Sequence, residues 1–251
     1  MERDLLIDEF THQAESFNRS AVMRSADTLG VLVDAIPASA DERWIDVACG
    51  PGLITRELAP RVREALGVDL TPAMIEVARR EAGAQGLTNV GFALGDATAL
   101  DLPDGSFDGA VTRFSLHHIP LPGRVVAEMA RVVRPGGHVV IADHLTSEDA
   151  DAAAFHQEIE RLRDPSHWAC LTATRLVAVG TQAGLELVDA RRHPFTLDYA
   201  EWLGRGSGGP QAERLIEQAF AERSDQPTEF RRTDDGAGLQ LAYGLTIWRR
   251  S

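Results

Sequence analysis

Short apolar runs and apolar residues at helical spacing alternate along the first 145 residues of the chain. Residues 44–47 form a run too short for a helix, which predicts a buried strand, and the small residues at 48–52 predict a tight turn after it. Residues 53–58 then take up helical spacing. This order of strand, turn and helix indicates a binding site at the helix N-terminus, where free N–H groups and the helix dipole favour an anionic group.

The same alternation continues beyond this unit and predicts an α/β protein, because strands that alternate with helices usually form a parallel sheet. Further strands are predicted at residues 65–70, 89–94, 107–112 and 138–142, with a helix that begins at Pro72, a helix at 124–133 and a turn at 134–137.

Residues 1–40 are predicted to form two helices. Phe10, Ala14 and Phe17 follow helical spacing in the first, and the apolar face of the second ends at Pro37. The first helix either packs on the core or acts as a lid over a ligand, and one helix can do both.

The C-terminal part carries weaker patterns. Helices are predicted at 148–163 and 172–182, the second capped by Gly184, and the last two strands at 185–188 and 239–248. Between these strands, residues 198–236 form a long insertion rich in Gly, Pro and charged residues, with a helix at 212–223 and a flexible segment at 204–209. Three interpretations of the insertion stay open: a mobile cover near the mouth of the substrate site, a surface excursion or an oligomer contact.

Composition is that of a globular domain. The chain has 251 residues, of which 44% are hydrophobic and 25% charged. No run approaches the roughly 18 apolar residues of a membrane span, and the first residues do not resemble a signal peptide. We therefore expect a cytoplasmic protein without a membrane partner.

The charge pattern narrows the class of substrate. A formal charge of −13 argues against a nucleic-acid substrate, because phosphate binding requires a basic face, so we expect a small molecule. The two cysteines, Cys49 and Cys170, make no metal-binding pattern, and we expect no metal site. The oligomeric state is open, with a homodimer as one expectation.

Residues 46–52 carry the most specific pattern in the chain, Asp46-x-Ala48-x-Gly50-x-Gly52. A dinucleotide fingerprint would require a third glycine at Thr55, and that glycine is missing. The pattern resembles motif I of the class I S-adenosylmethionine-dependent methyltransferases, with alanine in place of the first glycine.

Three further segments are similar to one type within that family, the small-molecule methyltransferases of ubiquinone and menaquinone biosynthesis. They are Asp101-x-Pro103-x-x-x-Phe107-Asp108, Leu116-His117-His118 and Arg134-Pro135-Gly136-Gly137. The resemblance covers roughly residues 10–145, and the order of the motifs is more specific than any one of them.

The resemblance implies a Rossmann-like, doubly wound sheet that is mostly parallel, with an antiparallel C-terminal strand and helical lid segments. It also implies one methyltransferase domain over residues 1–251. Within it we expect an N-terminal helical lid at 1–40, a cofactor-binding core at 41–145, and substrate-side helices, final strands and the insertion at 146–251.

The resemblance also implies S-adenosyl-L-methionine as the cofactor. Asp69 follows Asp46 by one βαβ step, at a strand tip where a carboxylate can accept hydrogen bonds from both ribose hydroxyls. Asp96 occupies the family position that receives the adenine amino group. The expected cofactor-binding residues are Asp46, Ala48, Gly50, Gly52, Asp69, Leu70, Met74, Gly95, Asp96, Ala97, Arg113 and Phe17.

Methyl transfer from a sulfonium requires the acceptor atom to be held in line, about 3 Å from the methyl group. A general base is needed only if the acceptor loses its proton, and histidine suits that role because its pKa lies near neutrality. The candidate catalytic residues are His117, His118, His144 and His167, with the first two favoured.

The function predicted is methyl transfer to an O, N or C atom of a small molecule. The alternative is a relative that binds the cofactor but catalyses another reaction, such as a cyclisation or a decarboxylation. A nicotinamide-dependent dehydrogenase is disfavoured by Thr55 and by the positions of Asp46 and Asp96.

Overall fold

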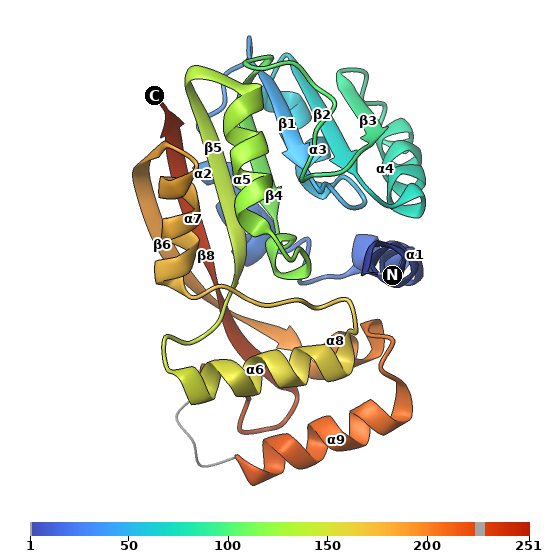
Figure 1. Cartoon of the computed structure of the whole chain (residues 1–251). Coiled ribbons are helices and arrows are strands. Elements are labelled where there is room, and N and C mark those ends of the chain that lie inside the picture. The colour runs from blue at the N-terminus through green and yellow to red at the C-terminus, as the bar shows by residue number, and fades with distance from the viewer. Residues whose placement is uncertain (1, 224–228) are drawn as a thin grey trace.

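The computed structural model of the chain describes residues 2–223 and 229–251. A single path of hydrogen-bonded strands runs in the order β3-β2-β1-β4-β5-β8-β6, and β7 pairs with β8 beside it (Figure 1). Strands β1 to β5 are parallel, and β8 is antiparallel to both of its long neighbours. The predicted Rossmann-like sheet with an antiparallel C-terminal strand is confirmed. The strands are β1 Arg43–Val47, β2 Glu64–Asp69, β3 Val90–Leu94, β4 Phe107–Arg113, β5 Val133–Leu145, β6 Leu185–Asp198, β7 Arg231–Arg232 and β8 Gly238–Arg250.

Helices cover both faces of the sheet because neighbouring residues of its strands point to opposite sides. Trp44 of β1 packs in the same apolar cluster as α2 and α3, whereas its neighbour Ile45 packs in the cluster that contains α5 and α7. The helices are α1 Glu2–Arg19, α2 Val31–Ala35, α3 Leu53–Leu58, α4 Pro72–Ala84, α5 Pro122–Val132, α6 Ala150–Arg163, α7 Ala173–Gln182, α8 Tyr199–Arg205 and α9 Gly209–Glu222.

The turn predicted at 134–137 lies inside a longer strand. While β4 advances from Phe107 to Gly109, its partner β5 advances from Val133 to His138. The residues between Val133 and His138 therefore bulge out of the ladder, and Gly136 takes a left-handed φ of +77°. The sequence signalled the turn correctly, but not that the strand continues on both sides of it.

The last two strands are also longer than predicted. The pattern marked only residues 185–188 of β6, because this edge strand exposes most of its side chains and buries few apolar ones. Its far end carries Phe195 and Leu197, which join Leu239 and Leu241 of β8 in the apolar cluster that also includes α6, α8 and α9. The extension of these strands thus supports the helices that Figure 1 shows beneath the sheet.

The insertion predicted at 198–236 contains α8 and α9. Helix α9 begins at residue 209, three residues before the predicted start, because Gly209 and Pro210 form its first turn. Residues 224–228 of the insertion, and residue 1 of the predicted lid, lie outside the described residues. Among the described residues, no helix combines the length and the apolar character needed to cross a bilayer.

Candidate functional site

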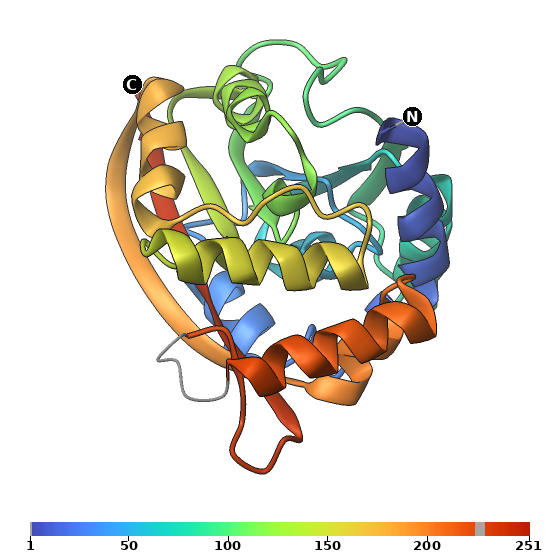
Figure 2. The same ribbon diagram turned by 60° about the horizontal axis from the view of Figure 1, so that its bottom comes forward.

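A cavity of about 620 Å³ opens at the edge of the sheet where the parallel strands end. Strand β1 lies between β2 and β4, so the chain order reverses beside it, and open α/β sheets place their ligands at such a point. Helix α1 and the segment that follows α6 form the opposite wall. Figure 2, in which this edge faces the viewer, shows α6 crossing in front of the sheet and α1 at its side.

Of the residues predicted to bind the cofactor, all except Gly52 line this cavity. They come from α1, from the end of β1 and the turn after it, from the ends of β2, β3 and β4 and from the start of α4. Residues separated by almost 100 positions in the sequence are thus gathered around one space.

The turn after β1 takes left-handed backbone angles at Ala48, Gly50 and Gly52, with φ of +56°, +52° and +76°. Glycine adopts this region freely, whereas a side chain is strained there, which explains why the motif has glycine at the position that Ala48 occupies in this chain. Gly52 faces away from the cavity, and a Cβ atom there would lie 2.6 Å from the Phe92 ring. Its glycine serves the turn and the packing on β3.

Asp46 is the penultimate residue of β1, and its side chain caps the following helix. Its Oδ2 accepts hydrogen bonds from the Thr55 N–H at 3.0 Å and from the Thr55 hydroxyl at 2.7 Å. Burial raises the pKa of the Asp46 carboxyl to about 7, although both Thr55 bonds oppose that rise. Asp46 therefore titrates near neutrality beside the cavity.

Thr55 also explains how the site forms without the third glycine. Close packing of helix on strand is preserved by Gly67 of β2 instead, because a Cβ atom there would lie 2.8 Å from both the Thr55 hydroxyl and Cys49 Sγ. The Cys49 thiol is buried in this contact, and burial raises its pKa well above the usual value, so it stays protonated and unreactive.

Asp69 is fixed by two backbone donors. Its Oδ2 accepts from the Gly50 N–H at 2.8 Å and its Oδ1 from the Thr71 N–H at 2.9 Å. Each carboxylate oxygen can accept a further bond, so the pair is ready for a ligand with two neighbouring hydroxyl groups. Burial raises the pKa of this carboxyl despite the two N–H donors.

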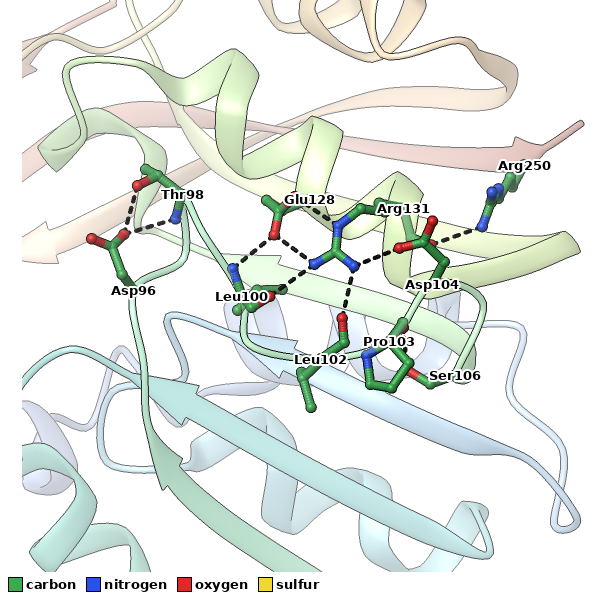
Figure 3. Close-up of polar contacts among 10 residues, drawn as sticks. All are labelled: Asp96, Thr98, Leu100, Leu102, Pro103, Asp104, Ser106, Glu128, Arg131 and Arg250. Carbon is green, nitrogen blue, oxygen red and sulfur yellow. Dashed lines mark hydrogen bonds and ion pairs between the residues drawn. The ribbon is translucent and has the colours of Figure 1, made fainter.

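The loop after β3 carries Asp96, whose Oδ1 accepts from the Thr98 N–H at 2.8 Å and hydroxyl at 2.7 Å. Arg131 of α5 holds the rest of this loop by donating to the carbonyl oxygens of Leu100 and Leu102 at 2.8 and 2.7 Å (Figure 3). Glu128 accepts from the Leu100 N–H at 2.7 Å and from the same guanidinium. Helix α5 thus sets the position of the loop on the cavity wall.

Arg113 brings a buried cation to the end of β4. Its guanidinium donates to the Met23 carbonyl at 2.9 Å and to the Thr28 hydroxyl at 3.1 Å, but its buried Nε has no hydrogen-bond partner among the described residues. Burial lowers the pKa of Arg113 to about 10, and the group stays charged. A buried, unpaired donor beside Asp46 is suited to a ligand carboxylate.

Of the four candidate histidines, His118 and His167 line the cavity, whereas His117 and His144 lie behind them. The His117 ring is held at 2.6 Å by Asp143 and stacks on the His144 ring with 4.8 Å between centroids. Burial opposes protonation of His117, but the Asp143 carboxylate outweighs it and raises the pKa of His117. No cluster of histidine, cysteine or acidic side chains in residues 2–223 and 229–251 is arranged to hold a metal ion.

Sequence reasoning missed three polar residues of this region: Asp143, Asp164 and Ser166. Asp143 pairs with His117, and the Ser166 hydroxyl lies 3.1 Å from His118 Nδ1. No local pattern marks them, because each has a partner in a distant segment: His117 for Asp143, Gln13 for Asp164 and His118 for Ser166.

Comparison with known proteins agrees with this geometry. A family model described as a methyltransferase domain matches residues 45–141. An uncharacterised methyltransferase of Bacillus subtilis, YcgJ, is 31% identical over 217 residues, which are 86% of this chain and 86% of that protein. The chain belongs to the S-adenosylmethionine-dependent methyltransferases.

The structure of this methyltransferase is also similar to that of YcgJ. The crystal structure of YcgJ has a TM-score of 0.81 and 28% identity and covers 89% of this chain and 98% of that chain. A demethylmenaquinone methyltransferase of Renibacterium salmoninarum is 34% identical over 113 residues, 45% of this chain and 46% of that protein. The cyclase SpnF, at 20% identity and a TM-score of 0.64, shares the fold alone.

Proposed function

We propose that this methyltransferase acts on a small molecule held in the cavity beside the cofactor, and that the residues predicted from the sequence bind S-adenosylmethionine there. Asp69 receives the ribose hydroxyls, Asp96 the adenine amino group and Arg113 the methionine carboxylate. The observation that carries this assignment is Asp69, whose two oxygens are fixed by the Gly50 and Thr71 N–H groups at the cavity wall.

The chemistry of the donor set fits the cofactor. The unpartnered Nε of Arg113 matches a carboxylate, and the left-handed turn at Gly50 lets backbone approach the ligand. Asp46 lies next to Arg113. When the Asp46 carboxyl is ionised, it matches the cationic part of the methionine moiety of the cofactor. When bound, the cofactor supplies an activated methyl group.

The acceptor occupies the part of the cavity nearer α1. This wall is largely apolar, with Leu6 and Phe10 from α1 and Ile119 after β4. Its polar groups include His118 and His167, so the acceptor has an apolar body and a small polar head. The charge of −13 argues against nucleic acid as the acceptor. A role in small-molecule biosynthesis, the cytoplasmic location and the homodimer stay predictions.

The assignment of Asp69 is tested by titration calorimetry with S-adenosylhomocysteine. Asp69→Asn keeps an acceptor for one backbone N–H but loses the paired carboxylate, and we expect affinity to fall by about ten- to a hundredfold, the equivalent of one charge-assisted hydrogen bond. Asp101→Asn, on an exposed residue outside the cavity, is the control. Equal affinity in Asp69→Asn and the parent would refute the ribose assignment.

A further inference from the structure

His118, Ser166 and Asp164 form a continuous polar relay that ends at the cavity. Asp164 Oδ1 accepts from the Ser166 hydroxyl at 2.6 Å and from the Ser166 N–H at 2.9 Å. The same hydroxyl oxygen lies 3.1 Å from His118 Nδ1. Asp164 Oδ2 accepts from the Gln13 amide of α1 at 3.1 Å, so the relay is also tied to the lid helix.

This arrangement determines which nitrogen of His118 carries the hydrogen. A serine hydroxyl has one proton, and Ser166 donates it to the Asp164 carboxylate. The Ser166 oxygen can then only accept from the imidazole, so Nδ1 carries a hydrogen and Nε2 carries a free lone pair. Burial alone would raise the pKa of Asp164, but the Arg163 guanidinium and the hydrogen bonds from Ser166 and Gln13 lower it, which keeps Asp164 an acceptor.

The surroundings keep His118 neutral. Burial lowers the pKa of His118, and the charge on His117, whose ring centroid is 4.3 Å away, lowers it further. His117 is the histidine that holds a proton, because Asp143 pairs with it. The charged or titratable groups that face the His118 ring are His117, Arg163, Asp164 and His167.

We propose that His118 Nε2 takes the proton from a hydroxyl group of the acceptor during methyl transfer, and that Ser166 and Asp164 position the ring for this task. The proposal rests on the function proposed above. The hydroxyl oxygen forms a bond to the methyl carbon, the carbon–sulfur bond breaks with its electron pair on sulfur, and the hydroxyl proton passes to Nε2. The imidazolium formed is stabilised through Ser166 by the Asp164 carboxylate, and it returns its proton to water after product leaves.

The acceptor class follows from this chemistry and from the cavity wall. A neutral amine attacks with a free lone pair and requires no base in that step, whereas a hydroxyl is a weak nucleophile until its proton is withdrawn. The Phe10 ring meets the His118 ring edge-on, with centroids 4.8 Å apart, and leaves an apolar surface next to the base. The structure thus assigns an apolar or aromatic alcohol, such as a phenol, to this site.

The tautomer is measured directly on histidine labelled with ¹⁵N, in the full chain saturated with S-adenosylhomocysteine. We expect the His118 signals to show a hydrogen on Nδ1 and none on Nε2. Ser166→Ala should give a mixture of tautomers, and Ser166→Thr, which keeps the hydroxyl, should restore the single form. A parent spectrum with the hydrogen of His118 on Nε2 would overturn the proposal.

The base role is tested with 1-naphthol as the probe and 1-methoxynaphthalene, which lacks the hydroxyl, as its matched control. Saturating 1-naphthol should shift the His118 Nε2 resonance, and the methyl ether should leave it in place. The same response to both compounds, or none to either, contradicts the proposal. His138→Asn, on the part of β5 distant from the cavity, should leave the response unchanged.

Turnover is followed by transfer of label from methyl-labelled cofactor to 1-naphthol and to 1-naphthylamine. His118→Asn keeps a donor toward Ser166 but has no base, and we expect the rate on the naphthol to fall by about 10²- to 10⁴-fold with cofactor affinity unchanged. Methylation of the naphthylamine alone, or a rate of naphthol methylation in His118→Asn equal to that of the parent, would contradict the hydroxyl assignment. If the parent binds no S-adenosylhomocysteine in calorimetry, the proposed function itself is wrong. This result distinguishes failure of the proposed function from failure of the base role of His118 alone.

Discussion

Asp46 and Asp69 both lie near the end of a strand and are both buried, yet their oxygens accept different sets of hydrogen bonds. Asp46 Oδ2 is occupied by the two donors of Thr55, while the oxygens of Asp69 each take one backbone N–H. Asp46 therefore carries a larger penalty for its charge, since burial raises its pKa to about 7. A cationic ligand would offset that penalty, so we expect Asp46 to lower the stability of the free protein and to raise its affinity for such a ligand.

The free protein should consequently lose stability as the pH rises. The folded pKa of about 7 lies above the unfolded value of 3.8, so the folded state binds more protons between these values. Stability falls as the pH rises from about 4 to about 7 and then stays low. Asp46→Asn keeps an acceptor for Thr55 without the charge, and we expect its free energy of unfolding at pH 8 to exceed that of the parent by at least about 1 kcal/mol.

Urea unfolding of both proteins at pH 4 and pH 8, without cofactor, measures this difference. The two curves should converge at pH 4, where the parent carboxyl is protonated. Asp104→Asn, on a side chain that is 74% exposed, should follow the parent at both values. An Asp46→Asn variant no more stable than the parent at pH 8 would show that the charge is already compensated in the free protein.

Two elements of the cavity wall, the loop after β3 and helix α1, are each held by contacts outside the cavity. The backbone of the loop after β3 is hydrogen-bonded to the side chains of Arg131 and Glu128 of α5, as Figure 3 shows. Helix α1 is tied to α4 by the ion pair between Glu15 and Arg80, 2.6 Å apart, and to the segment after α6 by Gln13. The cavity wall can therefore be loosened by changes that touch no ligand.

Arg131→Met tests the first of these anchors. The variant leaves the Leu100 and Leu102 carbonyls without their donor, so we expect a loss of about 2 kcal/mol in stability and a weaker affinity for S-adenosylhomocysteine. Arg134→Met is the matched control, because this half-exposed residue pairs with Asp108 at the opposite end of the sheet and exposed ion pairs contribute about 0–1 kcal/mol. Denaturant unfolding and calorimetry give both quantities. Unchanged affinity in Arg131→Met would mean that the loop keeps its shape without this anchor.

Helix α1 should behave as a lid. Its residues Arg3, Leu6, Phe10 and Phe17 line the cavity, so a bound ligand adds contacts to a helix otherwise held at a few points. We expect S-adenosylhomocysteine to slow amide exchange in residues 2–20, as measured by mass spectrometry. Helix α9 contributes nothing to the cavity lining and serves as the internal reference. Equal exchange of residues 2–20 with and without ligand would make α1 an ordinary packed helix.

Across the whole molecule, the segment around the end of α8 contacts the N-terminal part of the chain. The Ser207 hydroxyl donates to Glu9 of α1, and Arg205 at the end of α8 donates to Ser20 at 3.2 Å. The C-terminal part thus braces the N-terminal helix, on the platform built by the long ends of β6 and β8. We therefore expect a linkage between ligand binding in the cavity and the stability of the whole fold.

Thermal unfolding should report that linkage. S-adenosylhomocysteine at about 100 times its dissociation constant contributes about 2.7 kcal/mol, which for a chain of this length corresponds to a rise in Tm of roughly 5–10 °C. NAD⁺ at the same concentration should have no effect, because Thr55 replaces the glycine of the dinucleotide fingerprint. Calorimetric scans measure both, and a rise with NAD⁺ alone would favour the dehydrogenase.

The sequence by itself determined the succession of strands and helices along the first half of the chain, the turn after β1 and the spacing of Asp46 and Asp69. These features are local, since a strand, a turn and a helix are each encoded in a few consecutive residues. The fold class followed from them, and all the predicted cofactor residues except Gly52 line one cavity.

Only the tertiary structure decided which histidines reach that cavity and what state they are in. Adjacent residues His117 and His118 have the same type and neighbourhood in the sequence, yet one pairs with Asp143 behind the wall and the other meets Ser166 at its surface. The length of β6 was hidden for a related reason, because an edge strand buries few of the residues that mark a strand. Protonation and burial depend on charges and side chains brought from distant segments, and no local pattern contains them.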